Sequence, residues 1–220
     1  MASRSPIARE GFPFIAIFIA VAIIGTLTNS AFPLGNVLLW ILALWCIWFF
    51  RDPDRNTPVV PGGVIAPADG RVVAIEEVAQ APLSGEPARK FSIFMNVFNV
   101  HVNRSPMEGT VTDLAYHKGQ FVNAALDKAS IENERMEILL TLPNGTKLPF
   151  VQVAGLVARR IICRAVVGDR LQAGERFGLI RFGSRVDIYL PLDAEVKMGL
   201  GDITLAGESV IAQLGEVKPS

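Results

Sequence analysis

The first constraint on this chain is an uncharged stretch that runs over Gly11–Phe50. It is about twice the length of the roughly 20 residues that one membrane-spanning helix needs. The polar and turn-forming residues of Thr26–Gly35 divide it into two apolar segments, 12–25 and 36–50, each near or below the lower limit for a full span. The sequence therefore predicts a membrane-associated helical hairpin, formed either by a shallow loop or by two tilted short spans.

Basic residues flank the predicted hairpin, with Arg4 and Arg9 before it and Arg51 and Arg55 after it. Because the cytoplasmic ends of membrane segments are enriched in Lys and Arg, we expect both ends, and the chain beyond them, to lie on the cytoplasmic face. A secretory signal peptide is the alternative for the first segment. It is disfavoured because the apolar region resumes after the break and no clear small-residue cleavage site precedes a polar mature start.

After the hairpin the chain changes to short apolar runs separated by glycine and proline, which is a β-rich pattern. Asn144-Gly145 between two such runs predicts a β-hairpin, and Val122–Ser130 is the good helix candidate. The stretch 192–212 resembles half of a biotinyl/lipoyl-type β-sandwich. We therefore expect a β-rich α+β fold, with a biotinyl/lipoyl-like sandwich core at 56–220 and a membrane-associating helical hairpin at 1–55. The apolar runs are 72–75, 91–94, 138–142, 151–157 and 161–167.

Composition disfavours several classes of function. The formal net charge is zero, which argues against binding to nucleic acid. Cys46 and Cys163 are too few for a disulfide scaffold. The sequence has no Cys/His cluster typical of zinc, no glycine-rich phosphate loop and no dinucleotide fingerprint. Lys197-Met198 is similar to a carrier-lysine context, but Val196 stands where methionine is usual, so a surface lysine is favoured.

The Gly183-Ser184 bond lies between two β-type runs and is a candidate self-cleavage site. A residue without a side chain before the serine lets Ser184 Oγ approach the Gly183 carbonyl in a strained turn and convert the amide to an ester. Elimination from that ester would leave a pyruvoyl group. Taken alone, a Gly-Ser pair is more typical of an ordinary turn, so the surrounding residues must decide.

Two other residues are candidates to assist such a reaction. Asp69 lies in the turn Pro67–Gly70 before a predicted strand, where a fixed carboxylate can orient a base, although a simple Asp-Gly turn is the alternative. His101 is one of two histidines and is a candidate to deprotonate Ser184, the alternative being a hydrogen-bonded strand histidine. In such a triad Asp fixes the imidazole tautomer and His activates the hydroxyl. The sequence alone does not show that the three residues meet.

With these residues in view, the chain resembles the phosphatidylserine decarboxylase proenzymes of the short, archaeal-type class that is found also in bacteria. Each matching segment is weak alone, but their order and spacing are specific. The segments are Phe49–Arg55, Ala66–Gly70, Phe98–Arg104, Gly119–Ala124, Asn133–Arg135 and Gly178–Ser184.

The resemblance implies a precursor that cuts itself between Gly183 and Ser184, within a catalytic domain at 56–220. Residues 1–183 would become a membrane-bound β chain, and residues 184–220 an α chain that begins with a pyruvoyl group made from Ser184. The implied reaction converts phosphatidylserine to phosphatidylethanolamine and carbon dioxide through a Schiff base on the pyruvoyl group, without pyridoxal phosphate or a metal. The implied location is the cell membrane, with the catalytic domain on the cytoplasmic face and the two chains joined as a heterodimer that is able to assemble further.

By motif, the resemblance implies that Asp69 and His101 assist the cut and that His101 also lies near the decarboxylating centre. The chain departs from the long class of the family at two positions: Arg185 follows the serine where that class has threonine, and Arg104 replaces the second of two histidines. Arg104, Arg181 and Arg185 are candidates to bind the lipid phosphate or the serine carboxylate, with a structural or solvated arginine as the alternative for each.

Two rival functions remain. A membrane-anchored adaptor with a lipoyl-like β-domain would share the anchor and the C-terminal glycine pattern, and it predicts an uncut chain. An adaptor gives Asp69, His101 and Gly183-Ser184 no common function. A pyruvoyl enzyme for a soluble amino acid or another phospholipid is the second rival, and the membrane segment argues against the soluble substrate.

Overall fold

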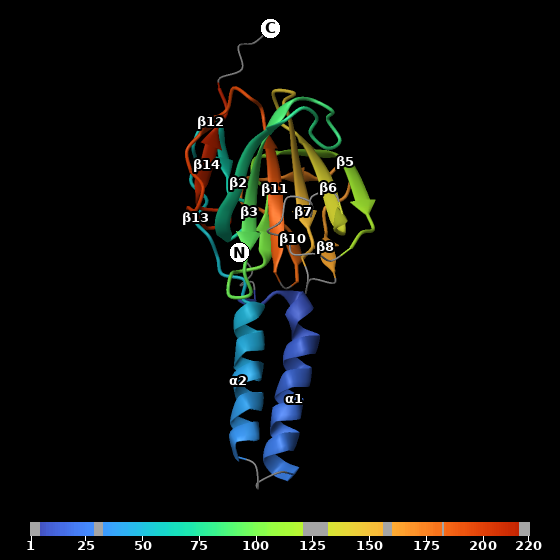
Figure 1. The fold of residues 1–220 in the computed structure, drawn as a ribbon, viewed down its shortest axis with the longest axis vertical. Helices are drawn as coiled ribbons and strands as arrows, with labels where there is room; N and C mark the ends of the chain where they lie inside the picture. The colour runs from blue at the N-terminus through green and yellow to red at the C-terminus, as the bar shows by residue number, and fades with distance from the viewer. Residues whose placement is uncertain (1–4, 29–32, 121–131, 156–159, 182, 216–220) are drawn as a thin grey trace. The chain divides into compact units, whose positions relative to one another are not determined.

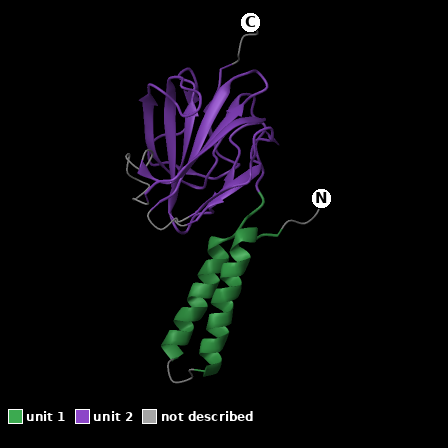
Figure 2. Cartoon of the chain, turned by 90° about the vertical axis from the view of Figure 1, so that its right-hand side faces the viewer, with its two compact units in different colours: residues 1–54 green, residues 55–220 purple. Residues whose placement is uncertain are grey.

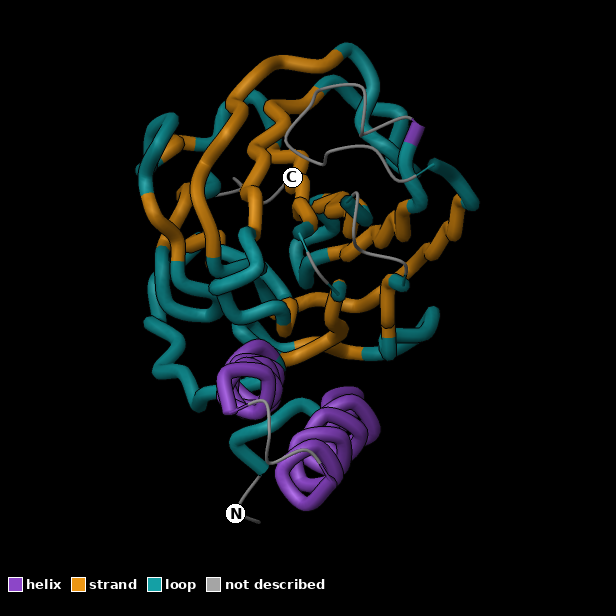
Figure 3. The backbone as a smooth tube through the Cα atoms, turned by 60° about the horizontal axis from the view of Figure 1, so that its bottom comes forward, coloured by secondary structure: helices purple, strands orange, loops and turns teal. Residues whose placement is uncertain are grey.

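Two apolar helices make up most of the first of two compact units, residues 1–54 (Figure 2). After one 3-10 turn, η1 (Arg9–Gly11), the helices are α1 (Phe12–Thr28) and α2 (Pro33–Phe49). They lie side by side, as the view along them in Figure 3 shows, and Trp40 Nε1 of α2 donates a hydrogen bond of 3.2 Å to Thr26 Oγ1 of α1. The computed structural model describes residues 5–28, 33–120, 132–155, 160–181 and 183–215.

The helices extend further into the predicted polar break than expected. The hydroxyls of Thr26 and Thr28 donate to the carbonyls of Ala22 and Ile24, each at 2.8 Å. These polar groups are satisfied inside α1, so the helix continues to Thr28 and the predicted end at residue 25 was wrong. The helical segment 9–28 has 20 residues and is long and apolar enough to cross a membrane by length and composition, whereas α2 has 17 residues.

Three antiparallel sheets form the second unit, residues 55–220, among the described residues (Figure 1). The largest has eight strands in the order β13-β2-β3-β11-β7-β6-β5-β9, and the smaller ones have the orders β1-β14-β12 and β4-β10-β8. The strands of the large sheet are β2 (Gly70–Val78), β3 (Ala88–Met95), β5 (Gly109–His117), β6 (Arg135–Thr141), β7 (Lys147–Val153), β9 (Arg170–Leu171), β11 (Ser184–Leu190) and β13 (Ile203–Thr204). The others are β1 (Gly63–Ile65), β4 (Val102–Arg104), β8 (Ile161–Cys163), β10 (Arg176–Ile180), β12 (Glu195–Val196) and β14 (Val210–Gln213).

The β-rich prediction is confirmed. The Asn144-Gly145 turn joins β6 to β7, with Gly145 at φ +85° and the Gly145 N–H donating to Leu142 O at 2.9 Å. The predicted run 161–167 was wrong beyond Cys163, because the Asp169 carboxylate accepts the Val166 N–H at 2.9 Å and closes a turn there. The predicted helix 122–130 and the end of the run 151–157 lie outside the described residues.

Strand β11 lies inside the large sheet, between β3 and β7, and all of its residues are buried. Because side chains alternate along a strand, its two faces differ. Val186, Ile188 and Leu190 belong to the main hydrophobic core, together with Phe91 of β3 and Phe150 of β7. We call this side of β11 the inner face. The opposite side, the outer face, carries Arg185, Asp187 and Tyr189.

Candidate functional site

The Gly183–Ser184 bond lies immediately before β11, where the chain arrives from the end of β10 at Ile180. Gly183 has φ +61°, a left-handed conformation that L side chains rarely adopt. A Cβ built on Gly183 would meet no atom within 4 Å. Glycine is therefore required here by the backbone conformation rather than by lack of space.

Ser184 is the first residue of β11 and is fully buried. It pairs with Met95, the last residue of β3, and it faces the same side as Val186, which is the inner face. Among the described residues, Ser184 Oγ has no hydrogen-bond partner. Buried hydroxyls are normally paired, so the lack of a partner makes this hydroxyl a candidate for a chemical role.

Asp69 is held by two groups that sequence analysis did not connect with it. Arg55 Nη2 lies 3.2 Å and 2.9 Å from the two carboxylate oxygens, and the Ala206 N–H donates to Oδ1 at 2.7 Å. Arg55 also contacts Glu208 at 3.3 Å, and the hydrogen bond from the Asn56 N–H lowers the pKa of Glu208, with Arg55 adding to the effect. The Asp69 carboxylate is thus fixed in place directly before β2.

His101 lies directly before β4 and is fully buried. Its Nδ1 is 3.0 Å from the carbonyl oxygen of Asn99. Because a carbonyl oxygen only accepts hydrogen bonds, Nδ1 carries the proton and Nε2 is the basic nitrogen of the neutral ring. The backbone carbonyl of His101 accepts the Ile180 N–H at 3.3 Å, which places His101 beside the end of β10, four residues before Ser184.

The sheet register brings the candidate residues to one end of the β unit. Arg71 of β2 pairs with Phe94 of β3, and Phe94 pairs with Arg185 of β11. A Cβ on Gly70 would lie 2.2 Å from the Phe94 carbonyl oxygen, so the turn that carries Asp69 is close to the end of β3. The start of β2, the end of β3 and the start of β11 therefore lie together. The described partners of Asp69 are Arg55 and Ala206, and its contact with His101 stays a prediction.

The three candidate arginines occupy different surroundings. Arg185 is buried on the outer face, where its Nε and Nη2 donate to Asp187 at 2.7 Å and 2.9 Å, so its side chain faces away from Ser184. Arg104 is buried on β4, where Nη1 donates to the Gly174 carbonyl at 3.0 Å. Arg181 is half-buried in the link between β10 and Gly183. Its position next to the candidate cleavage site favours it over Arg185 as a ligand for an anion.

Two further polar residues near Ser184 were missed by sequence analysis. Asn103 of β4 and Gln152 of β7 are fully buried, and Gln152 Nε2 donates to Asn103 Oδ1 at 2.8 Å. Asn103 is part of the segment Phe98–Arg104 that carried the resemblance, but no spacing rule connects it with Gln152, 49 positions away. Among the residues that the structure describes, no three His, Cys, Asp or Glu side chains gather as a metal site would require.

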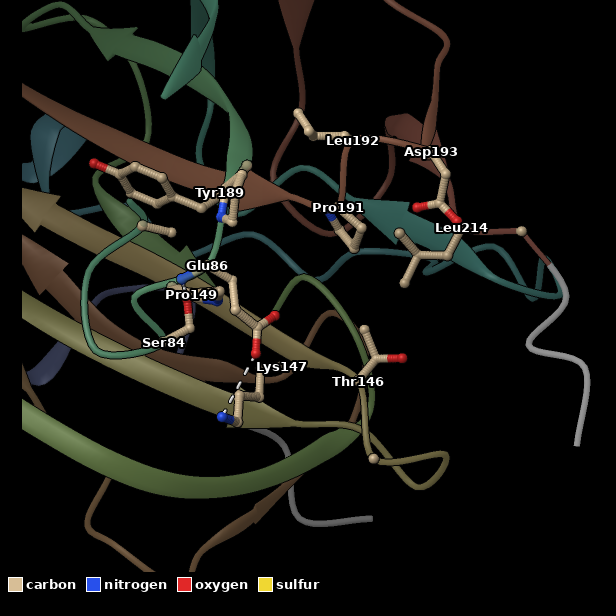
Figure 4. Close-up of a pocket in the computed structure, with 15 residues that line it drawn as sticks. Ser84, Glu86, Thr146, Lys147, Pro149, Tyr189, Pro191, Leu192, Asp193 and Leu214 are labelled. Atoms are coloured by element: carbon tan, nitrogen blue, oxygen red, sulfur yellow. Dashed lines mark hydrogen bonds and ion pairs between the residues drawn. The ribbon is translucent and has the colours of Figure 1, made fainter. Parts of the chain in front are cut away.

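A groove of about 610 Å³ lies at the other end of β11 (Figure 4). Its lining includes Tyr189 and Pro191 on one side and Lys147, which forms an ion pair of 3.6 Å with Glu86, on the other. Burial, reinforced by the negative charge of Asp187, raises the pKa of Tyr189 above its ordinary value. The groove is five or more strand positions away from Ser184, so it does not belong to the candidate site.

Comparisons with known proteins bear on the family of this chain. Residues 42–212 match the sequence model of the phosphatidylserine decarboxylase family. The chain is also 58% identical, over 212 residues, to the phosphatidylserine decarboxylase proenzyme of Magnetococcus marinus, and the alignment covers 96% of this chain and 95% of that protein. The matched region contains Asp69, His101 and the Gly183–Ser184 bond.

Proposed function

Because the chain belongs to the phosphatidylserine decarboxylase family, we propose that it is a precursor that cuts itself between Gly183 and Ser184. Its mature form then converts phosphatidylserine to phosphatidylethanolamine and carbon dioxide. The observation that carries this proposal is the buried Ser184 hydroxyl, which lacks a described partner and follows a glycine in the left-handed conformation. This combination supports attack on the preceding peptide bond.

In the proposed cut, Ser184 Oγ forms a bond to the Gly183 carbonyl carbon and the amide C–N bond breaks. His101 Nε2 is the candidate to take the hydroxyl proton and return one to the leaving nitrogen. Elimination then removes the proton from Ser184 Cα, breaks the Cβ–Oγ bond and releases Gly183 as a carboxylate. Water replaces the nitrogen of residue 184, which leaves as ammonia, and a pyruvoyl group remains.

The surroundings of residue 184 fit such a group. The position is buried on the inner face, next to Met95, and a buried amide pair lies nearby. A pyruvoyl group held there would supply a carbonyl that binds the substrate amine as a Schiff base and takes up the electron pair left on the substrate when carbon dioxide departs. His101 Nε2 is the candidate to return a proton to the substrate α-carbon. Asp69 and Arg55 form a fixed ion pair at the same end of the sheet.

The strand pairing supports a stable heterodimer of the two chains. Residues 184–220 contribute β11 between β3 and β7, β13 beside β2, and β14 beside β1. After the cut these pairings hold the α chain in the sheets of the β chain. The sheet β1-β14-β12 also supports the proposal that the C-terminal residues form a biotinyl/lipoyl-like architecture.

We propose that the helices α1 and α2 associate with the cell membrane and hold the enzyme where its lipid substrate lies. The basic residues that flank the hairpin support a cytoplasmic position for the catalytic unit. Arg181 and Arg104 are the candidates to bind the phosphate or the carboxylate of the head group. Neither a metal nor pyridoxal phosphate takes part in the proposed reaction.

The first test compares the intact mass of the purified wild-type protein with that of Ser184→Ala under denaturing conditions. We expect the wild type to yield a fragment with the mass of residues 184–220 and a pyruvoyl group at its start, and the variant to yield one uncut chain. The wild type is also expected to form phosphatidylethanolamine from phosphatidylserine vesicles. An uncut wild-type chain would favour the adaptor instead.

A further inference from the structure

Three fully buried polar side chains interrupt the apolar core on the inner face of β11. They are Ser184 of β11, Gln152 of β7 and Asn103 of β4. Their neighbours in this core are apolar, and include Met95 opposite Ser184 and Val186 opposite Gln152. A polar group in such surroundings costs free energy unless it forms hydrogen bonds, so the partners of these three residues need an explanation.

The contacts of Asn103 place its amide above β11. Asn103 pairs with Gly178 in the smaller sheet β4-β10-β8, and its side chain contacts two strands of the large sheet. Its Oδ1 accepts a hydrogen bond of 2.8 Å from Gln152 on β7, and its Nδ2 lies 3.6 Å from Met95 Sδ on β3. Since β3 and β7 flank β11, a group that contacts both lies over β11, at the level of Ser184.

The hydrogen bonds of this cluster are incomplete. A thioether sulfur is a weak acceptor, so the Asn103 amino group keeps most of its capacity to donate. Among the described residues, Gln152 Oε1 and Ser184 Oγ have no hydrogen-bond partner. The cluster therefore holds a buried donor whose partner is weak, beside a serine oxygen that has none.

The backbone leaves room for this amide pair. A Cβ on Gly178 would lie 2.4 Å from the Ile162 carbonyl oxygen and 3.0 Å from Gln152 Nε2. A larger residue at this position would displace either the strand β8 or the Gln152 side chain. Glycine at position 178 thus allows Gln152 to reach Asn103.

We propose that Asn103 donates a hydrogen bond to the oxygen carried by residue 184, and that Gln152 is the positioning residue that orients the Asn103 amide. Ser184 Oγ has no partner in the uncut chain among the described residues, so the bond forms as this oxygen gains negative charge during the reaction; after the cut the acceptor is the new carbonyl oxygen of residue 184. The bond from Gln152 to Asn103 Oδ1 turns Asn103 Nδ2 toward Met95 and Ser184. A fixed donor stabilises the negative charge on Ser184 Oγ as it loses its proton to attack Gly183, and again as the Cβ–Oγ bond breaks, without reorganising during the reaction. This inference rests on the proposed cut at Gly183–Ser184.

The test measures the first-order rate constant of the cut, followed by intact mass, in Asn103→Leu and Gln152→Leu. The leucine side chain has the shape of asparagine, is one atom shorter than glutamine and forms no hydrogen bond. We expect the cut to be about 100-fold slower in Asn103→Leu, the effect of losing one such donor. In Gln152→Leu it is expected to be about 10-fold slower, since the donor remains but is no longer oriented. The rate constant is informative because misfolded protein lowers only the final yield.

Ser92→Ala is the matched control. Ser92 is fully buried on β3, has no described hydrogen-bond partner and pairs with Asp187, so it lies on the outer face. It shares burial with the amide pair but not the inner face, and its loss is expected to leave the rate constant unchanged. Melting temperatures are compared in the uncut Ser184→Ala background, where both leucine variants are expected to stay within about 5 °C of the parent.

The outcomes separate this inference from the proposed function. If the wild-type chain is never cut, the proposed function fails. If the wild type is cut and both leucine variants are cut at the wild-type rate, the roles of Asn103 and Gln152 are refuted while the function stands. If Asn103→Leu does not fold, Gln152→Leu decides: a slower cut supports the inference and an unchanged rate overturns it.

Discussion

Both faces of β11 bury polar groups, but the hydrogen bonding of residues 185 and 187 differs from that of the inner-face groups. On the outer face the charges of Arg185 and Asp187 neutralise each other through two hydrogen bonds of 2.7 Å and 2.9 Å. On the inner face Ser184 Oγ and Gln152 Oε1 have no partner among the described residues. We therefore predict that the paired groups of the outer face stabilise the fold, and that the unpaired groups next to Gly183 take part in the proposed cut.

Ser92 is the residue that tests this rule. Its hydroxyl also lacks a described partner, although it lies on the outer face, opposite Asp187. If an unpaired buried hydroxyl were by itself a mark of catalysis, Ser92 would matter as much as Ser184. Because Ser92 lies away from Gly183, His101 and Asn103, we expect that the proposed cut does not need its hydroxyl.

The largest expected effect comes from His101. Because Nε2 is the candidate base for Ser184, His101→Ala is expected to slow the cut by about 10²- to 10⁴-fold, the usual contribution of a general base. The rate of α-chain appearance, measured by intact mass, gives the result. His117→Ala is the control, since His117 contacts Glu137 on a different pair of strands. Equal rates in the two variants would remove His101 from the mechanism.

The outer face is expected to respond in stability instead. Asp187→Ala leaves the Arg185 guanidinium buried without its carboxylate, and loss of one partner of a buried pair costs about 3–5 kcal/mol of unfolding free energy. Urea unfolding in the uncut Ser184→Ala background measures this loss. The double variant Arg185→Leu/Asp187→Leu is expected to recover most of it, because neither member of the pair is then buried without the other.

The same variants sharpen the comparison between the faces. In the wild-type background, folded Arg185→Leu/Asp187→Leu is expected to be cut with an unchanged rate constant. A slow cut in a stable double variant would show that the outer face takes part in the reaction, and the distinction drawn here would fail.

The smallest expected effect concerns Glu208, which is half-buried. The Asn56 N–H, with help from Arg55, lowers its pKa below the ordinary value of 4.5. Because the folded chain has the lower pKa, Glu208 contributes stability above the unfolded pKa, and this contribution is lost as the pH falls through the folded pKa. Glu208→Gln should therefore lower the melting temperature slightly at neutral pH and not at all in strong acid. A difference that persisted in acid would contradict this linkage.

Several elements were predictable because their causes are local. The uncharged stretch before Arg51 predicted the two helices, and the Asn144-Gly145 pair predicted the turn between β6 and β7. The helix ends were less accurate, since Thr26 and Thr28 satisfy their hydroxyls within α1. Side-chain hydrogen bonds of this kind decide boundaries that composition alone leaves open.

The Gly183-Ser184 bond and the residue types of the proposed chemistry can be read directly from the amino-acid sequence. Which of these residues come together follows from the packing of the folded chain. Arg55 binds Asp69, and Gln152 of β7 binds Asn103 of β4, through pairings of strands that are distant along the chain. It also decided that Arg185, next to Ser184 in sequence, faces the opposite side of the sheet. The physical reason is that side-chain periodicity is local, whereas strand order and register arise only when the whole core is packed.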